Sequence, residues 1–269
     1  MMKKTLLSLF CLVAAMATEA QTADMKVAVS NQLSVSRTAV PVALQLESPV
    51  GSALVMDAQG VEIPCQLDDL DGDGKYESLS FVVKEIGPKK SSHFTVTLSE
   101  SGQPRKYEPQ VYAEMMLTNK KIKSSNKQNL YISSLTVDNG TNPYWMLHHH
   151  GPAFENDMVA YRIYFDERQT VDIYGKYRRA LELRDTQFYP DSEQKAAGYG
   201  DDVLWVGKTF GVGALRGWHN GEMQMLQDVE SRTLSVVARG PLRTVVKVVD
   251  KGLNARYPDI CTAEERIDM

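Results

Sequence analysis

The residues best able to do chemistry are concentrated in one stretch, from His148 to Asp166. Three consecutive histidines precede a Gly-Pro turn, an acidic loop and a segment that places Arg162 among tyrosines. An imidazole that titrates near neutral pH can serve as a general base or acid, and a guanidinium binds carboxylates. The stretch therefore predicts a site that moves a proton beside a bound anion.

Residues 160–166 and 170–176 are predicted to form a β-hairpin connected by residues 167–169. Side chains alternate between the two faces of a strand, so one face of this hairpin is apolar and belongs to a core. The other face carries Arg162, Tyr164, Asp166, Asp172, Tyr174 and Lys176. Because arginine and lysine are rarely buried without partners, we expect this face to be concave and open to solvent, with His150 at its edge. A solvated face with internal salt bridges is the alternative.

The charged face suits an acidic sugar. We predict that Arg162 and Lys176 hold the carboxylate of a uronic acid, because a nearby cation stabilises the enolate-like transition state of proton abstraction. His149 or His150 is the predicted base, and Tyr164 is the predicted acid to the departing oxygen. Trp218 is either a sugar platform or a core residue. Further substrate contacts are predicted for Glu155, Tyr174, Trp218 and His219.

Metal binding is an alternative role for the histidines. On a strand, His148 and His150 would share one face and could hold a transition metal. Glu155, His219 or a residue elsewhere would have to supply a third ligand, and the sequence contains no second ligand motif.

An acidic loop in the first third of the chain has the spacing of a calcium loop. Asp69, Asp71, Asp73 and Glu77 occupy positions 1, 3, 5 and 9 of an EF-hand-like numbering, with a glycine at position 6. Position 12 is Ser80 instead of a bidentate glutamate, and the flanking segments resemble strands. The loop is therefore either a structural calcium site or a solvated hairpin turn, and no other cofactor is expected.

Composition and the N-terminus restrict the class of protein. The net charge of -4, without a basic stripe, argues against nucleic acid as a partner. Two lysines followed by the apolar run 5–17 predict a cleaved signal peptide over residues 1–20 and an exported, periplasmic or extracellular protein. The run is shorter than the roughly 20 residues of a membrane-spanning helix, so no span is expected. Cys65 and Cys261 remain after cleavage and either form a disulfide or stay as separate thiols.

Short runs that alternate apolar and polar residues recur along the chain with turn residues between them. This pattern predicts an all-β protein with a small N-terminal β-sandwich at 21–98 and a larger antiparallel β-sandwich at 107–269. Residues 99–106 read as a linker between them. The sequence ends inside a strand-like segment, which is the pattern expected if the last sheet is truncated.

A set of short motifs carries a resemblance to a known family. The motifs are residues 149–153, Glu155, and residues 160–166, 172–176, 206–213 and 239–241. They resemble a family of exported Bacteroidetes proteins with a domain of unknown function, found among genes for breaking down pectin, ulvan and related uronic-acid glycans. The resemblance implies a large β-sandwich with a lectin-like or mutarotase-like form and a role on carbohydrate. One family member acts as an ulvan oligosaccharide dehydratase.

Together these patterns predict an exported lyase or dehydratase that eliminates water or sugar from a terminal uronic acid of an acidic oligosaccharide. A non-catalytic glycan-binding protein of a polysaccharide-utilisation system would use the same face without a base. A glycoside hydrolase would need two carboxylates facing a cleft. Its candidate carboxylates are those of Glu155 with Asp157, Asp166 or Asp172.

Overall fold

The regular secondary structure of the described residues consists almost entirely of antiparallel strands, so the all-β prediction is confirmed. The signal-peptide prediction falls on residues outside the described part of the chain, and so does Cys261, the predicted disulfide partner of Cys65. Among the described residues no helix is long and apolar enough to cross a membrane. The computed structural model describes residues 22–122, 127–219, 221–227, 229–252 and 262–268, with the backbone alone for His219 and for residues 262–268.

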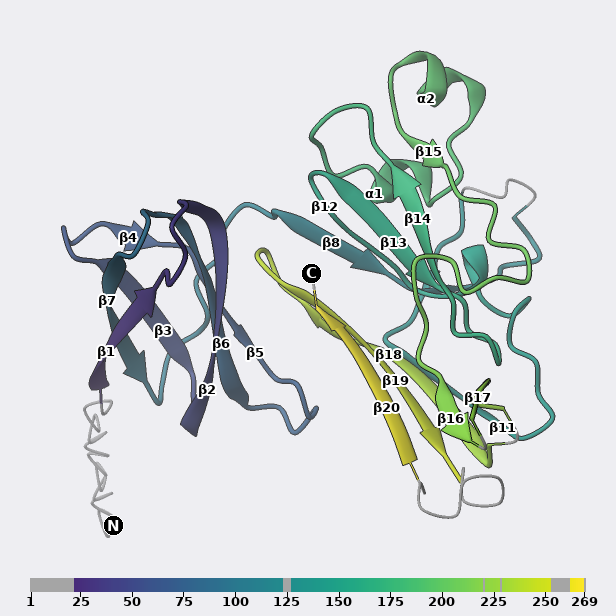
Figure 1. Cartoon of the computed structure of the whole chain (residues 1–269), viewed down its shortest axis with the longest axis horizontal. Helices are drawn as coiled ribbons and strands as arrows, with labels where there is room; N and C mark the ends of the chain where they lie inside the picture. Colours follow the sequence, from purple (N-terminus) through teal and green to yellow (C-terminus); the bar gives the residue numbers. More distant parts are fainter. Residues whose placement is uncertain (1–21, 123–126, 220, 228, 253–261, 269) are drawn as a thin grey trace, which may run out of the picture.

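The first unit consists of two antiparallel sheets that enclose one core (Figure 1). Its strands are β1 (Thr22–Ser30), β2 (Arg37–Val50), β3 (Ser52–Asp57), β4 (Glu62–Ile63), β5 (Cys65–Asp68), β6 (Tyr76–Ile86) and β7 (Ser91–Ser99). The sheets have the orders β1-β7-β3-β4 and β2-β6-β5. Alternate residues point inward, as in β6, where Leu79, Phe81 and Val83 are buried against Val55 and Val96 of the other sheet. Cys65 is buried in this core.

The second unit also has two main sheets, and its core lies between them. The described elements are β8 (Val111–Glu114), β9 (Met116–Leu117), β10 (Leu130–Tyr131), β11 (Ser134–Asp138), η1 (His148–His150), β12 (Ala153–Asn156), β13 (Val159–Ile163), β14 (Val171–Gly175), α1 (Leu183–Thr186), α2 (Ser192–Ala196), β15 (Asp201–Asp202), β16 (Gly217–His219), β17 (Glu222–Gln224), β18 (Ser231–Arg239), β19 (Thr244–Lys251) and β20 (Thr262–Asp268). One sheet has the order β15-β14-β13-β12-β8 and the other the order β11-β18-β19-β20. Phe154, Ile163 and Val171 of the first pack with Leu234 and Val246 of the second.

The charged face of the β13–β14 hairpin is buried, so the prediction of an open, solvent-accessible face is wrong. Arg162 is 3%, Tyr164 7% and Tyr174 0% exposed. The side chain of Lys176 is 1% exposed. The chain after β14, including α1, folds over this face, and its Leu183 packs with Tyr174. The alternation of side chains between the two faces of the hairpin was predicted correctly. In the pairing of β13 with β14, Arg162 lies opposite Asp172.

Gln66 of β5 joins the two units through the turn between β18 and β19. Its Oε1 accepts hydrogen bonds from the backbone N–H groups of Leu242 (2.8 Å) and Arg243 (2.9 Å). Its Nε2 donates to the carbonyl oxygen of Arg243 at 2.9 Å. Gly240 lies so close that a Cβ there would come within 2.0 Å of the Gln66 side chain. The contact between the units is therefore a buried polar one with little free space.

Gly240→Ala is expected to lower the melting temperature, because the added methyl group overlaps the amide of Gln66. Overpacking of this kind costs about 1–3 kcal/mol. Gly87→Ala is the matched control, since a Cβ at Gly87 would meet only the Lys90 side chain at 3.4 Å. Thermal unfolding monitored by circular dichroism measures both. Equal melting temperatures for the two variants would contradict the close packing at Gly240.

Candidate functional site

The three histidines form the short 3₁₀ turn η1 and do not lie on a strand, so the prediction of a strand that pairs His148 with His150 is wrong. His149 and His150 have φ angles of 39° and 68°, in the left-handed region that side chains other than glycine rarely adopt. At Gly151 a Cβ would lie 1.7 Å from the carbonyl oxygen of Ile163. The glycine is therefore required for the turn to pack against β13.

His150 lines a cavity of about 270 Å³, which we call the His150 cavity. Its walls come from the β13–β14 hairpin, η1, the chain after α1 and the segment 202–207. The lining residues are Tyr144, His150, Arg162, Tyr164, Arg168, Tyr189, Asp202, Leu204, Trp205, Val206 and Gly207. The structure thus brings together three of the predicted catalytic residues, namely His150, Arg162 and Tyr164.

The imidazole of His150 is held in one orientation. Its Nδ1 lies 3.0 Å from the carbonyl oxygen of Tyr144, and because a carbonyl only accepts, Nδ1 carries the proton and Nε2 keeps its lone pair. The ring stacks on Tyr144 at 3.8 Å between centroids and meets the edge of Trp145 at 5.0 Å. Burial lowers the pKa of His150. His150 is therefore a neutral imidazole at neutral pH, with Nε2 able to accept a proton.

Arg162 is occupied by protein carboxylates. Its Nε and Nη2 donate to Oδ2 of Asp172 at 2.9 and 2.6 Å, and Nη2 also donates to Oδ2 of Asp202 at 2.8 Å. The remaining hydrogen bonds reach the phenol oxygens of Tyr164 at 2.8 Å and Tyr189 at 2.5 Å. With two carboxylates on one guanidinium, the geometry does not support Arg162 as a clamp for a substrate carboxylate. It positions the two phenols instead.

The two phenols differ in what happens to their protons. Tyr164 donates its own proton to Oδ2 of Asp172 at 3.0 Å, so that proton is engaged within the protein. Among the described residues, none is shown accepting a hydrogen bond from the hydroxyl of Tyr189. Burial raises the pKa of both phenols, which keeps them protonated. Tyr189 is therefore better placed than Tyr164 to donate a proton into the cavity, and the sequence analysis did not single it out.

Arg168 and Trp205 also line the His150 cavity and were not predicted. The Nε and Nη2 of Arg168 donate to Oδ2 of Asp166 at 2.8 and 2.5 Å, and its Nη1 donates to the carbonyl oxygen of Gly207 at 2.7 Å, so three of its five N–H groups are used. The Arg168 side chain is 21% exposed against 4% for Arg162. Trp205 is 94% exposed. Arg168 is thus the more accessible of the two arginines that line this cavity. It lies in residues 167–169, which the sequence pattern indicated only as the connection between two strands.

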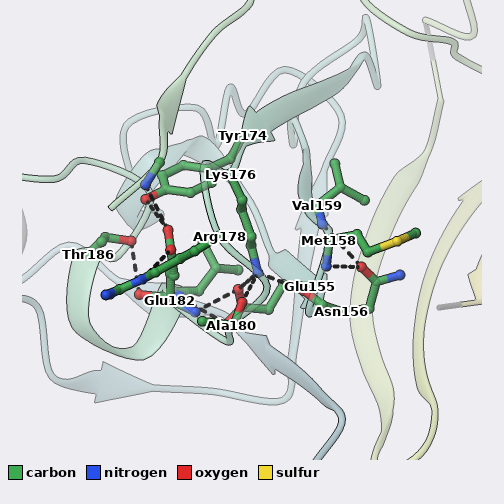
Figure 2. Close-up of polar contacts among 12 residues, drawn as sticks. Glu155, Asn156, Met158, Val159, Tyr174, Lys176, Arg178, Ala180, Glu182 and Thr186 are labelled. Carbon is green, nitrogen blue, oxygen red and sulfur yellow. Dashed lines mark hydrogen bonds and ion pairs between the residues drawn. The ribbon is translucent and has the colours of Figure 1, made fainter. Parts of the chain in front are cut away.

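Lys176 and Glu155 do not line the His150 cavity and belong to a buried polar network (Figure 2). The ammonium of Lys176 donates to the Glu155 carboxylate and to the carbonyl oxygens of Asn156 and Ala180, the latter two at 2.6 Å. An ammonium has three N–H groups, and these three acceptors use all of them. The geometry therefore does not support Lys176 as a carboxylate clamp or Glu155 as a substrate ligand.

Tyr174 belongs to the same network, through Glu182. Oε2 of Glu182 accepts from the hydroxyl of Tyr174 at 3.0 Å and from the backbone N–H of Gly200 at 2.8 Å. Arg178 pairs with the other carboxylate oxygen at 3.3 Å. Figure 2 shows these side chains pointing toward one another between β14 and the chain that follows it. Tyr174 is thus a buried anchor, and its predicted contact with substrate is not supported.

His149 is buried behind the His150 cavity and does not line it. Its Nε2 lies 3.1 Å from Oε1 of Glu114, and both side chains are fully buried. Burial lowers the pKa of His149 well below its usual value and raises the pKa of Glu114 to about 8. The pair is therefore a neutral hydrogen bond, which avoids two uncompensated buried charges. Of the two predicted bases, only His150 lies at the cavity.

Two further predicted site residues lie elsewhere. Trp218 is on β16, 73% exposed, and does not line the His150 cavity, so it is no core residue. The side chain of His219 lies outside the described part of the structure.

The acidic loop brings together three of its four predicted ligands. Ligand oxygens of Asp69, Asp71 and Glu77 lie within 4.8 Å of one another, and Asp73 is not in this group. The Asp69 carboxylate also accepts hydrogen bonds from backbone N–H groups of the loop, including that of Gly72 at 2.7 Å. This geometry fits a calcium ion and equally fits a turn that its own hydrogen bonds support.

The fold and the His150 cavity define an all-β protein of two units with a buried histidine turn beside an aromatic and cationic pocket. A family described as a domain of unknown function (DUF4861) matches residues 29–269. The match spans most of the chain, and the protein belongs to this family. A search of curated proteins found no match.

Lys176→Met is expected to destabilise the protein by about 3–5 kcal/mol, because it leaves the Glu155 carboxylate buried without its cation. Arg179→Met is the control, since Arg179 forms an exposed pair with Asp157 worth about 0–1 kcal/mol. Urea unfolding measures both. The double variant Glu155→Met/Lys176→Met should regain part of the loss, and equal stability of the two single variants would argue against the buried pair.

We retain calcium binding at the acidic loop as a proposal. Added calcium should raise the melting temperature of the wild-type protein, because a ligand that binds only the folded state stabilises it. The shift should vanish in Asp69→Asn/Asp71→Asn and persist in Glu85→Gln, which removes an exposed carboxylate outside the loop. A melting temperature that calcium does not change would leave the loop as a turn.

Proposed function

We propose that the protein is an exported carbohydrate-active enzyme, a carbon–oxygen lyase that eliminates water or sugar from a terminal uronic acid of an oligosaccharide. The observation that carries the proposal is a neutral His150, with Nε2 unprotonated, in one cavity with the phenol of Tyr189 and the guanidinium of Arg168. The resemblance to exported proteins of uronic-acid glycan loci, one of them an ulvan oligosaccharide dehydratase, supports the substrate class.

The proposed reaction is a β-elimination. Nε2 of His150 takes the proton from the carbon next to the carboxylate, and the electron pair forms a double bond to the neighbouring carbon. The carbon–oxygen bond at that neighbour breaks, and the leaving oxygen takes the proton of Tyr189 to depart as water or as a sugar hydroxyl. Arg168 stabilises the negative charge that develops on the carboxylate. Arg162 holds the phenol of Tyr189 in place.

These roles revise two of the predicted ones. His150 keeps its predicted role as the base. Arg168 takes the carboxylate-binding role predicted for Arg162 and Lys176, because Arg162 is paired with Asp172 and Asp202 and the N–H groups of Lys176 are all used inside the protein. Tyr189 takes the role predicted for Tyr164, whose proton is engaged by Asp172.

A non-catalytic glycan-binding protein is the second candidate, favoured by exposed tryptophans. Trp145, Trp205 and Trp218 are 76%, 94% and 73% exposed, although tryptophan is highly buried on average. Exposed indole rings can stack on sugar rings without any base. The hydrolase alternative has less support, because three of its candidate carboxylates are buried in ion pairs with arginine or lysine. These are Glu155, Asp166 and Asp172.

The enzyme proposal predicts a new conjugated double bond, seen as ultraviolet absorbance, when the protein is incubated with oligosaccharides from ulvan, pectin or glucuronan. His150→Ala should lower kcat by about 10²–10⁴-fold with binding largely kept, because it removes the base. His93→Ala is the matched control, since His93 is exposed on β7 of the first unit. Wild-type protein that binds these sugars without producing the absorbance would instead be a binding protein.

The pH dependence provides a second readout of the same experiment. The base is available above the pKa of His150 and is lost as pH falls through it. Because burial lowers that pKa from 6.5, the acid limb of kcat/KM should have its midpoint below pH 6.5, with a plateau at neutral pH. A midpoint at or above pH 6.5 would contradict His150 as the base.

A further inference from the structure

A second and larger cavity, of about 890 Å³, lies between the two units. One wall comes from Tyr76 and residues 103–107, at the end of the first unit. The other wall comes from β8, α1 and the turn between β18 and β19 (Figure 1). We call it the junction groove. It shares no lining residue with the His150 cavity.

The junction groove is lined by cations. None of the described residues that line it is acidic, while Arg105, Lys106, Arg184 and Arg239 all contribute to it. Glu62 pairs with Arg105 at 2.8 Å but does not line the groove. The whole chain has a net charge of -4, so the groove is a local concentration of positive charge on an acidic protein.

Four tyrosines also line the junction groove. The lining tyrosines are Tyr76, Tyr107, Tyr112 and Tyr131. The guanidinium of Arg184 lies 5.1 Å from the centre of the Tyr112 ring. Tyr112 donates to Glu114 at 2.9 Å, which holds its ring in place. Phenol rings and guanidinium groups in one groove suit a ligand with both ring faces and anionic groups.

The carboxyl group of Glu114, beneath Tyr112, does not oppose an anion in the groove. Glu114 lies behind Tyr112 and is fully buried. Burial raises the pKa of Glu114 to about 8, so at neutral pH this group is mainly protonated and adds little negative charge.

The β18–β19 turn of the second wall is anchored by residues of both units. Gln66 binds the backbone of Leu242 and Arg243, next to the residues of the β18–β19 turn that line the groove. The N–H of Gln110 donates to the carbonyl oxygen of Pro241 at 2.6 Å. A site whose walls are already in place loses less conformational entropy when it binds a ligand.

We propose that the junction groove binds an acidic oligosaccharide, a sugar chain that carries carboxylate or sulfate groups, at a site separate from the His150 cavity. Nucleic acid is the less favoured polyanion. A duplex carries one negative charge per roughly 1.7 Å of its axis and needs an extended basic surface, whereas here the cations are confined to one groove of a protein with net negative charge. This inference does not require that the His150 cavity be catalytic.

The test is calorimetric titration with a hexamer of galacturonic acid, in the His150→Ala background to prevent turnover. Arg184→Gln/Arg239→Gln should weaken binding about 10-fold or more, because two charge-assisted contacts are lost. Arg37→Gln/Arg179→Gln is the matched control, since it removes two exposed arginines that do not line the groove. Binding should also weaken as salt is raised.

Three results would overturn the proposal. The first is equal affinity of the groove variant and the control variant for the hexamer. The second is equally tight binding of a neutral maltohexaose, and the third is equally tight, arginine-dependent binding of a six-nucleotide single strand. Circular dichroism checks that each variant is folded. If the double variant Arg184→Gln/Arg239→Gln does not fold, the titration is repeated with the single variant Arg184→Gln. Groove binding that persists without any elimination activity would reject the proposed function and leave this proposal standing.

Discussion

The burial of a charged sheet face is the constraint on which the second unit depends. Lys176 and Glu155 would each be strongly unfavourable in the interior alone, and they are tolerated because every donor of the ammonium has an acceptor. Strand β12 supplies Glu155 and the carbonyl oxygen of Asn156, and the chain that follows β14 supplies the carbonyl oxygen of Ala180. This chain covers the sheet and places Tyr189 against Arg162. The His150 cavity exists because the charged face is covered incompletely.

The histidine turn shows how packing sustains an unfavourable backbone. Two successive residues with positive φ, His149 and His150, are costly outside glycine. The free-energy cost of this backbone is offset by the neutral hydrogen bond between His149 and Glu114 and by the close packing of Gly151 against Ile163. As a result one histidine is locked in the interior and its neighbour is presented to a cavity with a defined tautomer. Adjacent residues of the same type thus have opposite environments.

The two units are connected by more than a linker. Gln66 and Arg243 are 177 positions apart in the sequence, yet the amide of one satisfies the backbone of the other. A cavity of about 890 Å³ forms beside this contact, from residues of both units. If the junction groove and the His150 cavity both bind sugar, the protein has two separate surfaces for one class of ligand.

The sequence alone determined the all-β class and the sidedness of the central hairpin, because alternation is a local property of the chain. It identified Ile163 and Val171 as core residues and placed Arg162 opposite Asp172. It also marked the sharp turn at Gly151. Only the tertiary structure decided which charges remain available. Arg162 is paired with Asp202, 40 positions away, and no periodicity encodes such a contact. Whether a cation binds substrate or stabilises the fold depends on partners that folding brings together, and these are set by packing rather than by spacing along the chain.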